Sequence, residues 1–220
     1  MENRKYSIIK MPPNIRTFIA LELPPSVISL LAKVQNDLKS MRLRAKWVRP
    51  ENIHLTLKFL GNIDPGDIDK IGGAMMEAVG DFAGIDLVAR GVGVFPGVKH
   101  PRVIWVGLGG QIQSLFTMQR MLEDKLADLG FNKEKKPFKG HLTLGRFRQT
   151  INPNTIHQCI REYADLSSEK FTARRIILFK SDLKPTGAVY SQLRQAVLND
   201  EGRMTNEGCR FAPSTRYHSD

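Results

Sequence analysis

The sequence predicts an α+β fold of two similar lobes with a cleft between them. The tetrapeptide His-Leu-Thr-Leu occurs at residues 54–57 and, letter for letter, at residues 141–144, which is 87 residues later in a chain of 220. The elements predicted for the second half of the chain also follow the order of those predicted for the first. No linker or change of composition separates the halves. We therefore expect residues 15–198 to form one bilobed domain.

The first half of the chain alternates predicted strands and helices. Residues 15–23 predict a strand because they are rich in β-branched and aromatic residues. A helix then begins at Pro24-Pro25-Ser26, and its apolar residues follow the 3.6-residue period as far as Leu38. Residues 53–60 predict the strand that holds the first tetrapeptide. A second helix is expected over residues 65–79, although the pair of glycines within it weakens the prediction.

The rest of the chain repeats this alternation after a predicted hairpin. The hairpin joins strands at residues 87–95 and 102–108 through a wide loop that contains two prolines. Apolar residues at helical spacing predict a long amphipathic helix over residues 112–129, followed by a basic loop. The remaining predicted elements are a strand at residues 141–147, a helix at 153–163, and two strands at 170–181 and 189–198 joined by a turn at 184–187.

The two ends of the chain and its cysteines indicate in which cellular compartment the protein is expected. Residues 1–14 are expected to be a short extension without an apolar signal segment, and residues 199–220 a polar, disordered tail. No apolar run approaches the roughly 18 residues of a transmembrane helix. The two cysteines, Cys159 and Cys209, form neither a disulfide framework nor a zinc-binding pattern. We expect a cytoplasmic protein that does not enter a membrane, and we expect a monomer.

The chain is strongly basic, with a formal net charge of +11. Residues 15–198 hold 27 basic and 17 acidic side chains, so a surplus of 10 lies in the predicted domain and not in its ends. A basic surface favours polyanionic partners and accelerates their encounter. The charge is consistent with a nucleic-acid or nucleotide substrate but does not establish one.

The repeated tetrapeptide predicts acid–base chemistry on a phosphate. Side chains alternate across a strand, so His54 and Thr56 share one face while the two leucines enter the core, and His141 and Thr143 do the same. One neutral imidazole can accept a proton while the other, protonated, donates one. The threonine hydroxyls can bind non-bridging phosphate oxygens. No Asp, Glu or Cys cluster accompanies these histidines, so we expect neither a metal nor a cofactor.

Four further residues are candidates for contact with the substrate. Arg146 lies five residues after His141, so it faces away in a straight strand, but Gly145 permits a bulge that re-aims it toward a phosphate. Lys58 has the same parity as His54 and is a second possible cation. Phe18 and Tyr190, on the first and last strands, could stack on a base or sugar, although aromatic residues are more often buried in the core.

The sequence resembles the 2H phosphoesterase superfamily and, within it, the RNA 2′,3′-cyclic phosphodiesterases that were formerly called 2′-5′ RNA ligases. The resemblance extends over nearly all of residues 15–198, with Gly140 as a departure where the family often has proline. It rests on four strings: Arg16-Thr17-Phe18-Ile19-Ala20, His54-Leu55-Thr56-Leu57-Lys58-Phe59-Leu60-Gly61, Pro101-Arg102-Val103-Ile104-Trp105 and Pro137-Phe138-Lys139-Gly140-His141-Leu142-Thr143-Leu144-Gly145-Arg146.

The resemblance implies a fold, a reaction and a set of roles. Two pseudo-symmetric antiparallel sheets would face the central cleft, with helices on the outside. The reaction would open an RNA 2′,3′-cyclic phosphate to a 2′-phosphomonoester without a metal, and weak reverse 2′-5′ ligation would use an RNA 5′-hydroxyl in place of water. His54 would donate the proton to the leaving 3′ oxygen, His141 would activate water, and Thr56 and Thr143 would bind phosphate oxygens.

Other functions are also compatible with the sequence. The chain could be a nucleotide- or RNA-binding module without turnover, although both histidines and both threonines are intact. It could also run the same chemistry on another substrate. The candidates are a 2′-5′ oligoadenylate, a cyclic phosphate from tRNA splicing, ADP-ribose 1″,2″-cyclic phosphate and an RNA 3′ end that is trimmed. A purely structural RNA-binding protein is expected to display an aromatic and basic platform, and the sequence contains no such cluster.

Overall fold

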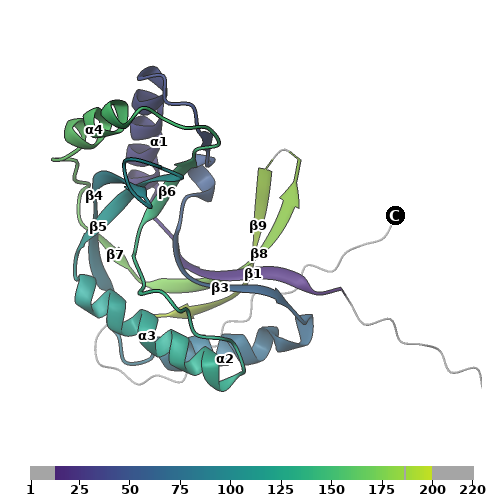
Figure 1. Cartoon of the computed structure of the whole chain (residues 1–220). Helices are drawn as coiled ribbons and strands as arrows, with labels where there is room; N and C mark the ends of the chain where they lie inside the picture. The colour runs from purple at the N-terminus through teal and green to yellow at the C-terminus, as the bar shows by residue number, and fades with distance from the viewer. Residues whose placement is uncertain (1–12, 186, 200–220) are drawn as a thin grey trace, which may run out of the picture.

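The computed structural model describes residues 13–185 and 187–199, which form an α+β fold (Figure 1). The strands are β1 Ile15–Leu21, β2 Lys46–Trp47, β3 Leu55–Ile63, β4 Ile85–Phe95, β5 Val103–Gly110, β6 Leu142–Arg146, β7 Phe171–Ala173, β8 Arg175–Lys184 and β9 Gly187–Val197. The α-helices are α1 Pro25–Ser40, α2 Ile68–Val79, α3 Ile112–Asp128 and α4 Pro153–Glu162, and two short 3₁₀ helices are η1 Pro50–Asn52 and η2 Pro65–Asp67.

The predicted elements are present with shifts of a few residues at their ends. The two-residue strand β2 is an addition that is too short for a period to reveal. The predicted strand over residues 170–181 is divided into β7 and the start of β8. The expectations for residues 1–12 and 200–220 lie outside the described residues, and Asn199, which we placed in the tail, forms a β-bridge with Ala83.

The nine strands of the described residues belong to one curled antiparallel sheet, so the two expected sheets are the halves of a continuous structure. The strand order is β7-β4-β5-β6-β3-β1-β8-β9, and β2 pairs with β6. One lobe contains β3, β1, β8 and β9, and the other contains β6, β5, β4 and β7. The register pair Leu55–Leu142 joins them, so the two tetrapeptides meet where the lobes meet.

The two halves of the chain exchange strands between the lobes. Strand β4 follows the first motif strand in sequence, yet it lies beside β5 in the second lobe. Strand β8 follows the second motif strand, yet it pairs with β1 in the first lobe. Each lobe is therefore completed by the other half of the chain, which explains why no linker separates the halves in the sequence.

The helices form two pairs at opposite ends of the curled sheet, α1 with α4 and α2 with α3 (Figure 1). Tyr163, at the end of α4, donates a hydrogen bond of 3.2 Å to Asp37 on α1. Lys125 on α3 forms an ion pair of 2.7 Å with Glu77 on α2. The buried apolar residues of the helices pack in one core with the leucines of the motif strands.

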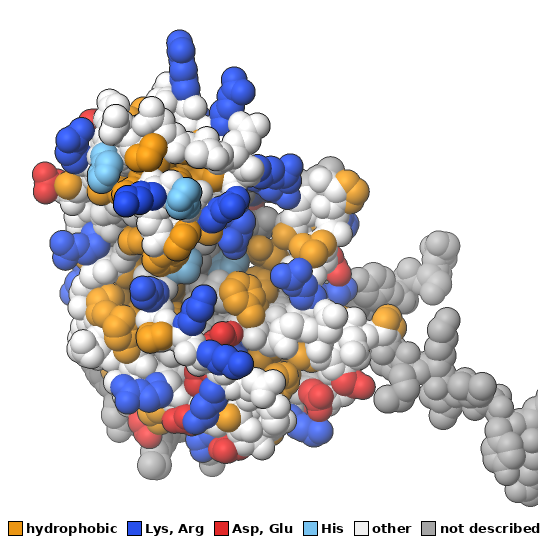
Figure 2. Space-filling view, in the orientation of Figure 1, with side chains coloured by type: hydrophobic (Ala, Val, Ile, Leu, Met, Phe, Trp, Pro, Cys, Tyr) orange, Lys and Arg blue, Asp and Glu red, His pale blue; other side chains and the backbone are white. Residues whose placement is uncertain are grey.

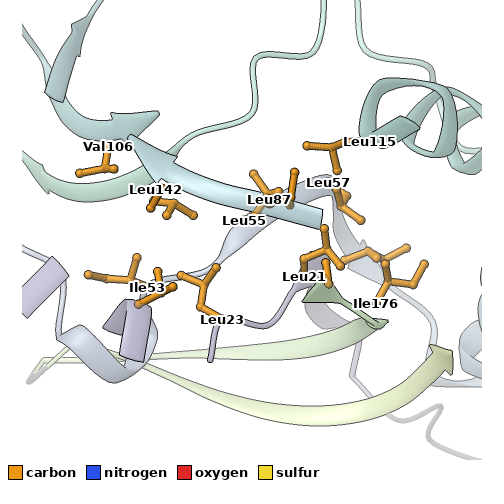
Figure 3. Close-up of a cluster of buried hydrophobic side chains, with 14 of the residues drawn as sticks. Leu21, Leu23, Ile53, Leu55, Leu57, Leu87, Val106, Leu115, Leu142 and Ile176 are labelled. Carbon is orange, nitrogen blue, oxygen red and sulfur yellow. The ribbon is translucent and has the colours of Figure 1, made fainter. Parts of the chain in front are cut away.

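The motif leucines are central to the core, as the alternation of the sequence predicts (Figure 3). Leu55, Leu57 and Leu142 are at most 3% exposed and pack with residues from both lobes. Burial of a leucine side chain contributes about 1.5–3 kcal/mol. Because the leucines hold the strands in the core, the intervening histidine and threonine of each motif are directed to the opposite face.

Candidate active site

A cavity of about 830 Å³ lies at the junction of the two lobes, and all four motif residues with functional side chains line it. His54 and Thr56 reach it from the β3 side, and His141 and Thr143 from the β6 side. Figure 2 shows histidine atoms recessed in this face, with hydrophobic and basic side chains around them. The structure thus brings the two imidazoles and two hydroxyls into one volume, as the repeated tetrapeptide predicts.

His54 is enclosed by aromatic rings. The Phe18 ring stacks on the imidazole with a centroid separation of 4.6 Å, and the Tyr190 ring meets it edge-on at 5.4 Å. The ring of Phe179 lies 6.4 Å away. Burial lowers the pKa of His54 to about 4, and the hydrogen bond to the Asn52 carbonyl opposes this shift only in part. In the free protein at pH 7 the imidazole is therefore neutral.

His141 also lies beside aromatic rings, but its imidazole is less buried than that of His54. Phe95 meets its imidazole edge-on with a centroid separation of 5.0 Å, and Trp105 lies at 6.4 Å. Burial lowers the pKa of His141, the hydrogen bond to the Lys139 carbonyl raises it, and the nearby Arg146 guanidinium lowers it further. The pseudo-symmetric motifs therefore hold their imidazoles in different environments.

Both imidazoles are held in one tautomer by the residue two positions earlier in the chain. The Nδ1 of His54 lies 2.8 Å from the Asn52 carbonyl oxygen, and the Nδ1 of His141 lies 2.7 Å from the Lys139 carbonyl oxygen. A carbonyl only accepts, so each Nδ1 carries a proton and each neutral Nε2 has a free lone pair. Each Nε2 can accept a proton when neutral and donate one when protonated.

A β-bulge follows each threonine and redirects the chain. On β6, Ile104 pairs with Gly145 and Trp105 pairs with Thr143, so Leu144 has no register partner on β5. The extra residue reverses the alternation, and Arg146 lines the cavity. The bulge that the sequence analysis allowed at Gly145 is present one residue earlier. Arg146 lies close enough to lower the pKa of His141.

The equivalent bulge on β3 overturns the expectation for Lys58. On β3, Ile19 pairs with Lys58 and Ala20 pairs with Thr56, so the extra residue is Leu57. The parity argument for Lys58 was therefore wrong, because it assumed a straight strand. Lys58 borders the cavity, but its ammonium is buried against α3, where it pairs with Glu123 at 2.8 Å and donates to the Asn132 carbonyl at 2.6 Å. This pairing balances the positive charge of the ammonium and leaves it unsuited to bind a substrate phosphate.

The two aromatic candidates have different positions. Phe18 is only 3% exposed and contacts the His54 ring, so it forms the wall behind the imidazole and leaves little surface for a base. Tyr190 is half-buried and lines the cavity. Burial raises the pKa of its hydroxyl, while the charges of Arg16 and Arg146 lower it. Tyr190 stays a candidate contact.

Sequence reasoning missed several residues that line the cavity. Phe59 is 55% exposed at the cleft and precedes Arg146 by 87 residues, the spacing of the two histidines, so a full alignment of the repeats would have found it. Arg16 lies on β1 beside the motif strand. Lys136 and Lys139, from the basic loop before the second motif, supply further positive charge. Only the path of that loop places them at the cavity.

Two absences concern the described residues alone. Within residues 13–185 and 187–199, no group of three or more His, Cys, Asp or Glu side chains is placed to hold a metal ion. In the same part of the chain, no helix combines the length and apolar character needed to cross a membrane.

Two His-x-Thr strands that face one cleft in a pseudo-symmetric α+β fold define a 2H phosphoesterase. The family described as LigT-like phosphoesterase matches the chain twice, over residues 21–105 and 106–190. These matches cover both halves, one motif in each, and the chain belongs to this family. The two-fold match also agrees with the internal repeat that the tetrapeptides indicate.

Several curated relatives of the chain share one name. An "RNA 2′,3′-cyclic phosphodiesterase" of Archaeoglobus fulgidus is 32% identical over 82% of this chain and 98% of the relative. A protein of the same name from Methanocaldococcus jannaschii is 31% identical over 82% of this chain and 99% of the relative. The matched length corresponds to the two lobes together, so the similarity is not confined to the motifs.

Solved structures show the same architecture. A crystal structure of a Thermus thermophilus protein has a TM-score of 0.70 at 25% identity, and the match covers 86% of this chain and all of the other. Apo Escherichia coli LigT has a TM-score of 0.64 at 19% identity with the same coverage, a likeness that concerns the fold alone.

Proposed function

We propose that this protein hydrolyses RNA 2′,3′-cyclic phosphates to 2′-phosphomonoesters by two-histidine acid–base catalysis. His141 Nε2 removes a proton from water as the water oxygen bonds to phosphorus. The bond from phosphorus to the 3′ oxygen breaks, and His54 Nε2 gives that oxygen its proton. The products are a 2′-phosphate and a free 3′-hydroxyl. Thr56, Thr143 and Arg146 bind the non-bridging oxygens while negative charge develops on them.

One observation carries the proposal: two tautomer-fixed imidazoles from separate lobes line a single cavity. The reaction needs one proton acceptor and one proton donor on opposite sides of a phosphorus atom. We assign both groups to side chains of the cavity, which hydroxyl and guanidinium donors also line. The curated relatives named RNA 2′,3′-cyclic phosphodiesterase support the choice of substrate. Reverse ligation stays a prediction from the resemblance.

The low pKa of His54 constrains the proposed order of proton transfer. His54 is neutral at pH 7 in the free protein, whereas its proposed role requires a protonated ring. An anionic phosphate beside the imidazole favours the charged form and raises its pKa. The scheme therefore requires that the substrate itself promote proton uptake by His54.

An analysis of the products tests the proposed function directly. An RNA oligonucleotide that ends in a 2′,3′-cyclic phosphate is incubated with the full chain, with and without a chelator. We expect a 2′-phosphate end under both conditions, distinguished from a 3′-phosphate by chromatography against synthetic standards. A 3′-phosphate would reverse the assigned leaving oxygen. Binding without product, with enzyme in excess, would favour a nucleotide-binding module.

The pH dependence of turnover should reflect the lowered pKa of both histidines. In the active free enzyme one of the two imidazoles is protonated on both nitrogens and the other is neutral, and both pKa values lie below the ordinary 6.5. We therefore expect kcat/KM to be highest below pH 6.5 and to fall as pH rises further. The bound anion raises both pKa values, so the alkaline limb of kcat should lie at higher pH than that of kcat/KM.

Initial rates between pH 4 and 9 at constant ionic strength measure both profiles, and circular dichroism at each pH monitors folding. A cyclic phosphodiester does not titrate in this range, so the limbs report the enzyme. A kcat/KM that increases through pH 7 to a plateau near pH 8 would contradict the two-imidazole scheme.

A different nucleotide substrate is the second reading that the sequence left open. The cavity contains phosphate-binding and acid–base groups that any cyclic phosphodiester could use. Competition between the RNA end and the other candidate nucleotides, compared by kcat/KM in the same assay, ranks these substrates.

A further inference from the structure

The bulges after the two threonines are each contacted by a buried glutamine from a helix in the opposite half of the repeat. Leu57 and Leu144 occupy equivalent positions in the tetrapeptides, and each is the residue without a register partner on the neighbouring strand. The bulge decides the facing of the residue two positions further on, because it reverses the alternation of the strand. A contact that holds the bulge in place therefore also determines which side chains line the cavity.

Gln35 on α1 contacts the second motif. Its Nε2 donates to the carbonyl oxygens of Leu144 and Val48, each at 2.8 Å. The same Leu144 carbonyl accepts from the Val48 amide at 2.9 Å. Gln35 is 1% exposed, although glutamine is mostly found at protein surfaces. The two hydrogen bonds thus join its side-chain amide to the bulge residue Leu144 and to Val48, which follows β2.

Gln119 on α3 makes the equivalent contact with the first motif. Its Nε2 donates to the Leu57 carbonyl at 3.3 Å and to Glu123 Oε1 at 3.3 Å. Gln119 is 7% exposed, and Glu123 in turn pairs with the buried Lys58. Helices α1 and α3 follow corresponding strands in the two halves, so each half of the chain contacts the motif of the other half.

We infer that Gln35 and Gln119 are positioning residues, which hold the two bulges and thereby set the facing of the residues beyond them. Gln35 acts on the segment from Thr143 to Arg146, which supplies a hydroxyl and a guanidinium to the cavity. Gln119 acts on the segment from Thr56 to Phe59, which supplies a hydroxyl and an exposed ring. The inference rests on the proposed function, because it assigns these segments to phosphate and substrate binding.

A double-mutant cycle between Gln35 and Arg146 tests this role with a cyclic-phosphate-ended RNA. Gln35→Met keeps the length of the side chain and removes its donors, and Arg146→Met removes the cation. Each single change should lower kcat/KM by about 10- to 100-fold, through misplacement or through loss of a charge-assisted hydrogen bond. If Gln35 acts by orienting Arg146, the kcat/KM of the double variant should be at most about threefold lower than that of the less active single variant.

Gln119→Met combined with Arg146→Met is the matched control, because Gln119 contacts the other motif. Here the losses of kcat/KM in the two single variants should multiply in the double variant. If Gln35→Met does not fold, Gln35→Glu keeps the shape of the side chain without an amide donor and replaces it in the cycle. Losses that multiply for Gln35 and Arg146, or wild-type kcat/KM in the Gln35 variant, would overturn the inference. Absence of turnover in the wild-type protein would instead overturn the proposed function.

Discussion

Replacement of either motif histidine by alanine should lower turnover of a cyclic-phosphate-ended RNA by about 10²–10⁴-fold, the usual size of one acid–base contribution. The reason is that each Nε2 has a separate task and neither imidazole can perform both in one step. His54→Ala removes the proposed donor and His141→Ala the proposed acceptor. Single-turnover rates with saturating enzyme isolate the chemical step from binding.

The two variants should differ when the leaving group no longer needs a proton. A substrate with sulfur in place of the 3′ oxygen releases a thiolate, which departs without protonation. This substrate should restore much of the lost rate to His54→Ala and little to His141→Ala. Rescue of His141→Ala in its place would exchange the two roles, and wild-type rates in both variants would remove the two-imidazole mechanism. The circular dichroism spectrum of each variant serves as the folding control.

Replacement of the motif threonines by valine should produce the second-largest effect. Thr56→Val and Thr143→Val keep the β-branched shape and remove the hydroxyl, so the strands should remain intact. Removal of one preorganised donor to a developing negative charge costs about 10²–10³-fold in kcat. We expect losses of this size for each variant, measured as kcat with the same RNA substrate.

A threonine outside the cavity provides the comparison. Thr172, on β7, does not line the cavity and hydrogen-bonds to Asp86 at 2.6 Å. Thr172→Val should leave kcat within about twofold of the wild type, since it changes a contact at the sheet edge. Motif variants that also retain wild-type kcat would show that the hydroxyls do not bind the phosphate in the rate-limiting step.

The sequence alone predicted much of the fold because its signals are local. Alternation in the motif strands, the helical period of α1 and α3, and the turn residues between β8 and β9 each depend on neighbours in the chain. The repeat added the long-range information that the two motifs are equivalent. The exchange of β4 and β8 between lobes was not predicted, because no local pattern records which strand a hairpin will pair with.

The residues of the site also differ in whether local sequence signals could predict them. Sequence sufficed to predict that His54, Thr56, His141 and Thr143 line one cavity, since alternation about buried leucines directs them away from the core. Only the tertiary structure decided what lies beyond each bulge: the Lys58 ammonium turned toward α3, while Arg146 reached the cavity. The physical reason is that one extra residue in a strand reverses every following side chain, and that residue is accommodated by contacts with distant segments, here the helices α1 and α3.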